Sequence, residues 1–240
     1  MDNQNNQPMT KTQRRDLRRQ EIMNQRQGQV KKSRLMTWVI SIAIVVVVGG
    51  LIAWAIKGSN SPAAPLTGAS EVPVLGSAAA KAVVMEFSDL SCPACATVAP
   101  IVRQLADFYQ DKIRIEFRSF NIGHQWSGKS LEAGRCALAQ GKFWEFSDKA
   151  FANLSSWESA DNAVDLFKSY AKDIGVNTDQ FNSCLDSGQT DSAIQEDMKL
   201  GKDKGVNSTP TFFINGQKKV GAQSLDEFKK VIDEELTKTN

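Results

Sequence analysis

Histidine is almost absent from this chain, and cysteine is scarce. Its 240 residues include one histidine, His124, and four cysteines, all of them at or after Cys92. A structural zinc site needs four cysteine or histidine ligands, usually in two closely spaced pairs. Two cysteines stand three residues apart, at positions 92 and 95, whereas the other two are 48 residues apart. The sequence therefore disfavours the interpretation of the close pair as half of a zinc site.

An excess of positive charge is missing from most of the chain. Residues 1–35 carry nine Lys and Arg against three acidic residues, but residues 36–240 carry 20 basic and 24 acidic ones. Nucleic-acid-binding domains concentrate basic residues on one face. No nucleic acid is therefore expected as a partner. We expect the basic arm, rich in Gln, Asn and Arg, to be disordered and to lie in the cytoplasm, where its charge acts as a topology signal.

A long uncharged segment follows the arm. Residues 36–56 carry no charge, and a helix of that length, at ~1.5 Å per residue, spans the ~30 Å hydrocarbon core of a membrane. Trp38 and Trp54 stand near its ends, where interfacial aromatic residues belong. A cleaved signal peptide is the alternative, but the arm is long for one. We expect a single-pass protein of the cell membrane whose remaining chain lies outside the cytoplasm, in an oxidising compartment.

The rest of the chain is expected to be a flexible linker and one α/β domain. Residues 57–80 are rich in Ala, Ser, Gly and Pro, as linkers are. The domain, residues 81–240, has alternating apolar patterns of strands and helices. The expected elements are a strand at 82–87, a helix at 93–109, a strand at 112–120, a helical block at about 123–204, strands at 211–214 and 217–220 joined by an Asn-Gly turn, and a helix at 225–236. A β-α-β half and a β-β-α half thus flank an all-helical insertion.

The close cysteine pair belongs to a Cys-Pro-Ala-Cys motif at the junction of the first strand and the first helix. Unpaired N–H groups and the positive end of the dipole at a helix N-terminus favour a thiolate. A thiolate is the species that attacks disulfides. The motif predicts dithiol–disulfide exchange with Cys92 as the nucleophile and Cys95 as the resolving thiol, a redox-active disulfide that needs neither an organic cofactor nor a metal.

Glu86 lies in the apolar strand six residues before Cys92. If the strand is buried on both faces, the carboxyl group is desolvated, its pKa is raised, and it can exchange a proton with Cys95. The alternation of the strand equally allows Glu86 to face solvent.

Thr209 and Pro210 stand at the head of an apolar strand. A Thr-Pro bond in this place is a candidate cis peptide. Opposite the dithiol it would leave the Thr209 backbone free to pair with a substrate strand. A trans proline that merely begins the strand is the alternative.

Cys136 and Cys184 both fall in the helical block. The oxidising compartment favours a structural disulfide between them, and two buried free thiols are the alternative. His124 is expected to be an ordinary loop residue.

Several segments together resemble the DsbA-like thiol–disulfide oxidoreductases of the thioredoxin superfamily, from about residue 76 to the C-terminus. These segments are residues 85–89 (MEFSD) with the motif at 92–95, residues 140–145 (QGKFWE), 181–185 (FNSCL) and 205–216 (GVNSTPTFFING). The resemblance implies a thioredoxin fold with an inserted helical domain, a cis-proline loop at Thr209-Pro210 facing the dithiol, and a buried acidic residue at Glu86. The best-known members have Pro-His between the cysteines where this chain has Pro-Ala. A membrane anchor and a second disulfide in the helical domain occur in some relatives.

The resemblance implies an enzyme that introduces disulfides into exported proteins with cysteine thiols. It also implies re-oxidation by a quinone-linked membrane protein. Two alternatives stay open at the sequence level. One is a disulfide reductase or isomerase at the same site. The other is a copper metallochaperone that binds Cu(I) through its thiolates, with His124 as its sole distant histidine ligand.

Overall fold

The computed structural model describes Met23 and residues 68–238. The predicted arm, Met23 excepted, the predicted membrane segment at 36–56 and the linker up to residue 67 lie outside the described residues. Among the helices that are described, none has the length and apolar character needed to cross a membrane.

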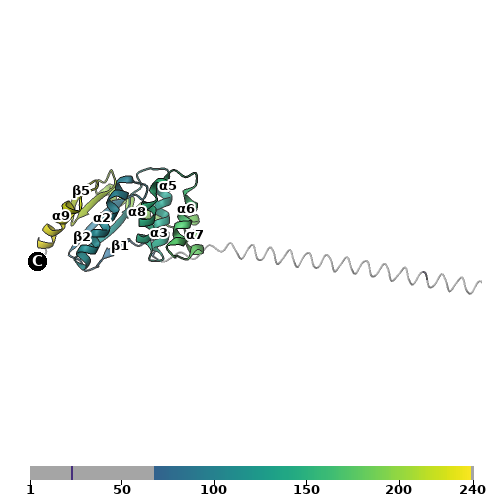
Figure 1. Ribbon diagram of the computed structural model, residues 1–240, viewed down its shortest axis with the longest axis horizontal. Helices are drawn as coiled ribbons and strands as arrows, with labels where there is room; N and C mark the ends of the chain where they lie inside the picture. The colour runs from purple at the N-terminus through teal and green to yellow at the C-terminus, as the bar shows by residue number, and fades with distance from the viewer. Residues whose placement is uncertain (1–22, 24–67, 239–240) are drawn as a thin grey trace, which may run out of the picture. The chain divides into compact units, whose positions relative to one another are not determined.

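A five-stranded mixed sheet forms the centre of the domain (Figure 1), with the strand order β1-β3-β2-β4-β5. Its strands are β1 (Val74–Gly76), β2 (Ala82–Ser88), β3 (Ile113–Ser119), β4 (Thr211–Ile214) and β5 (Gln217–Val220). β2 and β3 run parallel, and the other neighbouring pairs are antiparallel. The Cys-Pro-Ala-Cys motif follows β2, the central strand of the sheet, which pairs with β3 on one side and with β4 on the other.

Helices α2 (Pro93–Tyr109) and α9 (Leu225–Lys238) pack against one face of the sheet. α2 connects β2 to β3 through a short 3₁₀ turn, η1 (Gln110–Lys112), and makes the predicted β-α-β unit. Its apolar side, which includes Val98, Val102 and Leu105, joins alternate residues of β2 and β3 in one core. Ser224 caps α9: its hydroxyl accepts the Glu227 N–H, while the Glu227 carboxylate accepts from Ser224, as the sequence predicts.

Six helices between β3 and β4 make up the predicted helical insertion. They are α3 (Ser127–Leu138), α4 (Phe143–Ala152), α5 (Leu154–Glu158), α6 (Ala163–Asp173), α7 (Thr178–Ser187) and α8 (Asp191–Asp203). Most of them share a second apolar core with Trp157, Phe146, Phe167 and Phe181 at its centre. α8 returns the chain to the sheet and packs against β3. The expected α/β architecture with an inserted helical region is confirmed.

The structure differs from the predicted linker at its C-terminal end. Val74–Gly76 pairs with β3 in antiparallel register, Val74 opposite Glu116, and the Trp144 indole donates to the Val74 carbonyl at 3.1 Å. Gly76 has φ +85°, and a Cβ there would lie 2.1 Å from the Ile113 carbonyl oxygen. The edge strand is three residues long, too short for an alternating pattern to reveal it within a Gly- and Ala-rich stretch.

Candidate active site

Cys92 stands at the N-cap of α2, and Pro93 is the first residue of the helix. The chain leaves β2 at Ser88 and turns sharply, since the Cys92 N–H donates to the Asp89 carbonyl at 3.0 Å. Both thiols of the motif are free and buried. Proline suits this first helical turn because its nitrogen has no hydrogen to leave unpaired.

The surroundings of Cys92 favour its thiolate. A hydrogen bond from the Cys95 thiol has the largest effect and lowers the pKa of Cys92, whereas burial raises it. The Thr209 side chain and the backbone N–H groups of Cys95 and Ala94 lower this pKa further. Together they lower the pKa of Cys92 to about 5. At neutral pH Cys92 is therefore ionised and ready for nucleophilic attack.

The pKa values of Cys95 and Glu86 are shifted in the opposite direction, upward. Burial raises the pKa of Cys95 far above its ordinary value, and the Cys92 sulfur and the negative charge of Glu86 add to the effect. Glu86 is 3% exposed, and burial raises its pKa to about 7, against a weaker lowering by Ser88. Alternate residues of a strand point to the same face, so Glu86 shares with Ala82 and Val84 the face of the sheet that α2 covers. The buried alternative is the one observed.

The Thr209-Pro210 peptide is cis, and it stands directly before β4. The Thr209 carbonyl oxygen lies 3.5 Å from the Cys92 sulfur and accepts a hydrogen bond from it when Cys92 is protonated. The Thr209 hydroxyl is buried, and the Thr209 side chain helps to lower the pKa of Cys92. The structure thus brings together two segments 117 residues apart and places one backbone carbonyl and one hydroxyl beside the reactive sulfur.

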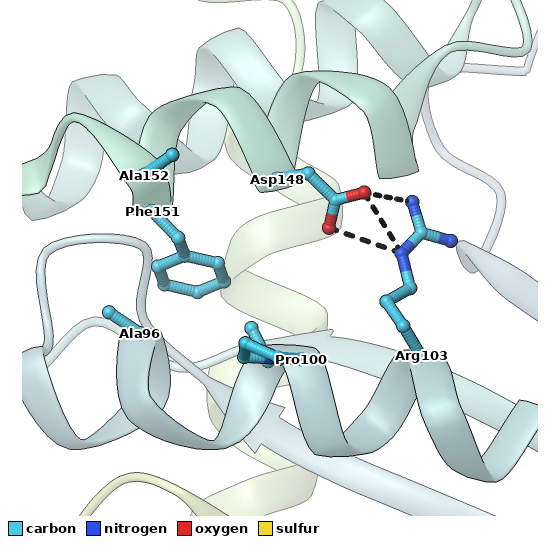
Figure 2. A pocket seen from close by; sticks show the side chains of 7 residues that line it. Ala96, Pro100, Arg103, Asp148, Phe151 and Ala152 are labelled. Carbon is cyan, nitrogen blue, oxygen red and sulfur yellow. Dashed lines mark hydrogen bonds and ion pairs between the residues drawn. The ribbon is translucent and has the colours of Figure 1, made fainter.

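A groove runs between α4 and the redox helix α2, which begins at the Cys-Pro-Ala-Cys motif (Figure 2). Small and apolar side chains line most of it, and the Arg103–Asp148 ion pair closes one part; its lining residues are Ala96, Ala99, Pro100, Arg103, Asp148, Phe151 and Ala152. The Arg103 guanidinium binds both carboxylate oxygens of Asp148 and lies over the Trp144 ring. Ala96 directly follows Cys95 in the chain, but neither cysteine of the motif is among the residues that line the groove.

The remaining candidate residues lie apart from this site. Cys136 in α3 and Cys184 in α7 are joined by a disulfide that links two helices of the insertion. His124 is exposed in the loop before α3. In the part of the chain that the structure describes, no three His, Cys, Asp or Glu side chains are arranged to hold a metal ion.

A protein-family model described as Thioredoxin matches residues 69–234 of the chain. The chain belongs to the thioredoxin family. Among curated relatives, the probable disulfide bond formation protein D of Bacillus cereus is 27% identical over 220 residues, covering 87% of this chain and all of the relative. The Na⁺/H⁺ antiporter NhaA 3 of Salinispora tropica is 30% identical over 155 residues, which cover 64% of this chain. That match spans only 23% of the antiporter, so this thioredoxin-family chain corresponds to a part of it.

Solved structures of thioredoxin-like proteins share the fold. Oxidised BdbD from Bacillus subtilis superimposes with a TM-score of 0.64 at 24% identity, over 69% of this chain and 93% of that one. Alpha-DsbA1 from Wolbachia pipientis gives a TM-score of 0.63, also at 24% identity, over 70% of this chain and 92% of that one. These likenesses show that the described domain has the thioredoxin fold, and the Cys-x-x-Cys motif stands at the start of its helix α2.

Asp89 is a residue of this thioredoxin-family site whose role the sequence did not reveal. It is fully buried, and its carboxylate accepts from the Ser91 N–H, the Ile122 N–H and the Ser127 hydroxyl. The local signal was an Asp two residues before Ser91, the spacing of an Asx turn. The contacts to Ile122 and Ser127 cross 33 and 38 residues and have no signal in the sequence.

Proposed function

We propose that this thioredoxin-family protein introduces disulfide bonds into exported proteins through a Cys92/Cys95 dithiol–disulfide cycle. The observation that carries the proposal is the placement of two free thiols: Cys92 at the N-cap of α2 beside Thr209, and Cys95 within the helix and fully buried. Cys92 is stable as a thiolate and Cys95 is not. A stable Cys92 thiolate makes the reduced enzyme favourable and makes Cys92 a good leaving group, and both effects favour oxidation of the substrate.

The cycle starts from an oxidised enzyme with a Cys92–Cys95 disulfide. A substrate thiolate attacks the Cys92 sulfur, which forms a mixed disulfide and displaces Cys95 with the bond's electron pair. Cys95 is disfavoured as an anion and takes a proton. The buried carboxylic acid of Glu86 is the proposed proton donor. A second substrate thiolate then attacks the substrate sulfur of the mixed disulfide. The substrate leaves oxidised, and Cys92 leaves as the thiolate.

The cis-proline loop supplies the docking edge for this reaction. The Thr209 carbonyl lies 3.5 Å from the Cys92 sulfur, so an extended substrate segment that pairs with the Thr209 backbone would bring its cysteine to Cys92. We assign Thr209 and Pro210 to substrate alignment, and Cys92, Cys95 and Glu86 to the chemistry. The Cys136–Cys184 disulfide is assigned a structural role only.

The cellular setting follows from the same chemistry. Disulfides persist in oxidising compartments, so the bonded Cys136–Cys184 pair supports a location outside the cytoplasm. The uncharged segment at 36–56 would anchor the chain in the cell membrane with the domain on the outer side. Each turnover leaves the enzyme reduced by two electrons, and a quinone-linked membrane protein is the proposed acceptor.

A peptide-oxidation assay on the full chain in detergent tests the activity. We expect the wild-type protein to oxidise a two-cysteine peptide with glutathione disulfide as the terminal oxidant. Cys92→Ser should abolish the reaction because the attacked sulfur is gone, whereas Cys136→Ala/Cys184→Ala should retain it. Equal rates for the wild-type protein and Cys92→Ser would contradict the proposal.

Redox titration against glutathione tests the direction. A reduction potential near that of strong oxidants, ~−120 mV, is expected for an oxidase. A potential near that of thioredoxin, ~−270 mV, would instead assign the site to disulfide reduction.

A further inference from the structure

Asp89 occupies the turn that leads from β2 into the redox helix. Its side chain is fully buried. One carboxylate oxygen accepts the Ser91 N–H at 2.9 Å, which makes an Asx turn inside the tight turn that the Asp89 carbonyl closes with the Cys92 N–H. The residue therefore shapes the backbone on which Cys92 stands.

The second carboxylate oxygen holds the start of the helical insertion. It accepts the Ile122 N–H at 2.9 Å and the Ser127 hydroxyl at 2.6 Å, and Ser127 is the first residue of α3. Asp89 thus joins the active-site turn to the loop by which the chain enters the insertion. A backbone hydrogen bond from Asp89 also reaches Cys95, although burial is the larger influence on that thiol.

Only a carboxylate satisfies this arrangement. Each of its two oxygens faces one backbone N–H, from Ser91 on one side and from Ile122 on the other. A backbone N–H cannot become an acceptor. An amide in either orientation would therefore place its NH₂ group against an N–H donor and leave a buried donor unpaired, which is costly.

We propose that Asp89 is a positioning residue of the redox site, whose carboxylate holds the turn before Cys92 and the entry to the insertion in the arrangement that keeps the Cys92 sulfur at the N-cap of α2 and beside Thr209. This inference rests on the proposed function, since it concerns the geometry of the same exchange reaction. It assigns to Asp89 no contact with the substrate and no proton transfer.

The Asp89→Asn variant separates positioning from a simple effect of charge. Loss of a nearby negative charge would by itself favour the Cys92 thiolate and lower the pKa of Cys92. Loss of the turn would move the sulfur from its N–H donors and raise that pKa. The two explanations predict shifts of opposite sign.

The experiment measures thiolate absorbance at 240 nm against pH for the reduced full chain in detergent, and the rate of peptide oxidation at pH 7. We expect Asp89→Asn to raise the pKa of Cys92 and to slow peptide oxidation by roughly tenfold, because a buried donor is left unpaired. A lowered or unchanged pKa would overturn the proposal, and so would a wild-type rate.

Asp197→Asn is the matched control. Asp197 is also buried and accepts a backbone N–H, that of Ser119, but it binds Arg135 rather than the redox turn. We expect it to lower the melting temperature while it leaves the pKa of Cys92 unchanged. The same shift in both variants would mean that general loosening of the fold explains the effect, and the proposal would fail.

Asp89→Ser provides a second measurement if Asp89→Asn does not fold. A serine hydroxyl can accept the Ser91 N–H but is too short to hold Ile122 and Ser127 as well. We expect a rate several-fold below wild type, and a rate and pKa equal to wild type would overturn the proposal. The wild-type assay distinguishes the two failures: an inactive wild-type protein refutes the proposed function, whereas an active one with an unaffected Asp89 variant refutes this inference alone.

Discussion

Three ionisable side chains of the site differ in their access to water and to hydrogen-bond donors, and this difference sets the direction in which the pKa of each is shifted. Glu86 and Cys95 lie in the core, where the charged form loses its hydration, so the pKa of each is raised. Cys92 is also buried, but donors surround its sulfur, and the pKa falls to about 5. One protein environment therefore prepares an anion and a neutral thiol three residues apart.

Replacement of Glu86 by glutamine should stabilise the protein above neutral pH. The pKa of Glu86 is about 7 in the folded state and about 4.5 in the unfolded state, so its favourable contribution is complete below pH 4.5 and is lost as the pH rises through 7. We expect Glu86→Gln to raise the free energy of unfolding at pH 8 by on the order of 3 kcal/mol, and by much less at pH 4.5. Urea denaturation at both pH values measures this.

The exposed Glu234→Gln is the control for that comparison, and it should leave both values within about 0.5 kcal/mol of wild type. A gain from Glu86→Gln that does not depend on pH would contradict ionisation as its cause.

At the scale of elements, the helical insertion is attached to the sheet by close packing of α8. Gly201 of α8 faces Phe120 and Phe87, and an added Cβ would lie 2.6 Å from two ring carbons of Phe120. Both rings are buried. The absence of a side chain at position 201 is what lets the helix approach the aromatic side chains.

Gly201→Ala should therefore destabilise the domain although alanine favours helices. Overpacking against the two rings costs about 1–3 kcal/mol, more than the ~1 kcal/mol that alanine contributes to a helix. Gly128→Ala in α3 is the matched control, because its nearest neighbour, Asn121 Nδ2, lies at an ordinary 3.7 Å. Urea denaturation should show a loss for Gly201→Ala and none for Gly128→Ala; equal effects would contradict the packing argument.

The Cys136–Cys184 disulfide links α3 to α7 within the insertion and spans 48 residues of sequence. Its removal should lower the free energy of unfolding by about 2–4 kcal/mol, because the unfolded chain gains conformations. We expect Cys136→Ala/Cys184→Ala to melt at a lower temperature by calorimetry and to keep wild-type peptide oxidation. A large loss of oxidation would show that this bond takes part in the redox chemistry.

At the scale of the whole molecule, the oxidation state of the dithiol is linked to folding stability. The pKa of Cys92 is about 5 in the folded reduced state and about 8.5 in an unfolded chain. Its contribution to the stability of the reduced form is therefore complete above pH 8.5 and is lost as the pH falls through 5. The oxidised form has no thiolate and lacks this contribution.

We expect the difference in melting temperature between reduced and oxidised protein to shift in favour of the reduced form as the pH rises from 5 to 8. Glu86 is present in both forms, so its titration largely cancels in the difference. Calorimetry of both forms at several pH values measures the shift. Cys92→Ala/Cys95→Ala keeps the Cys136–Cys184 disulfide, so its difference between oxidising and reducing buffers measures what that bond alone contributes, and this difference should not change from pH 5 to pH 8.

The sequence by itself determined the elements and the type of chemistry. The apolar periodicities place the strands, the redox helix and the capping box of α9, and the Cys-Pro-Ala-Cys spacing at a strand–helix junction indicates dithiol exchange. These are local properties, and neighbouring residues in the chain are sufficient to encode them.

Only the tertiary structure decided which distant groups meet the dithiol. Thr209 reaches Cys92 because β4 pairs with β2, and Glu86 is buried because α2 covers its face of the sheet. The contacts of Asp89 with Ile122 and Ser127 and the short strand β1 likewise depend on chain crossings. Desolvation and hydrogen bonds across such separations arise when the chain packs, and so no local pattern records them.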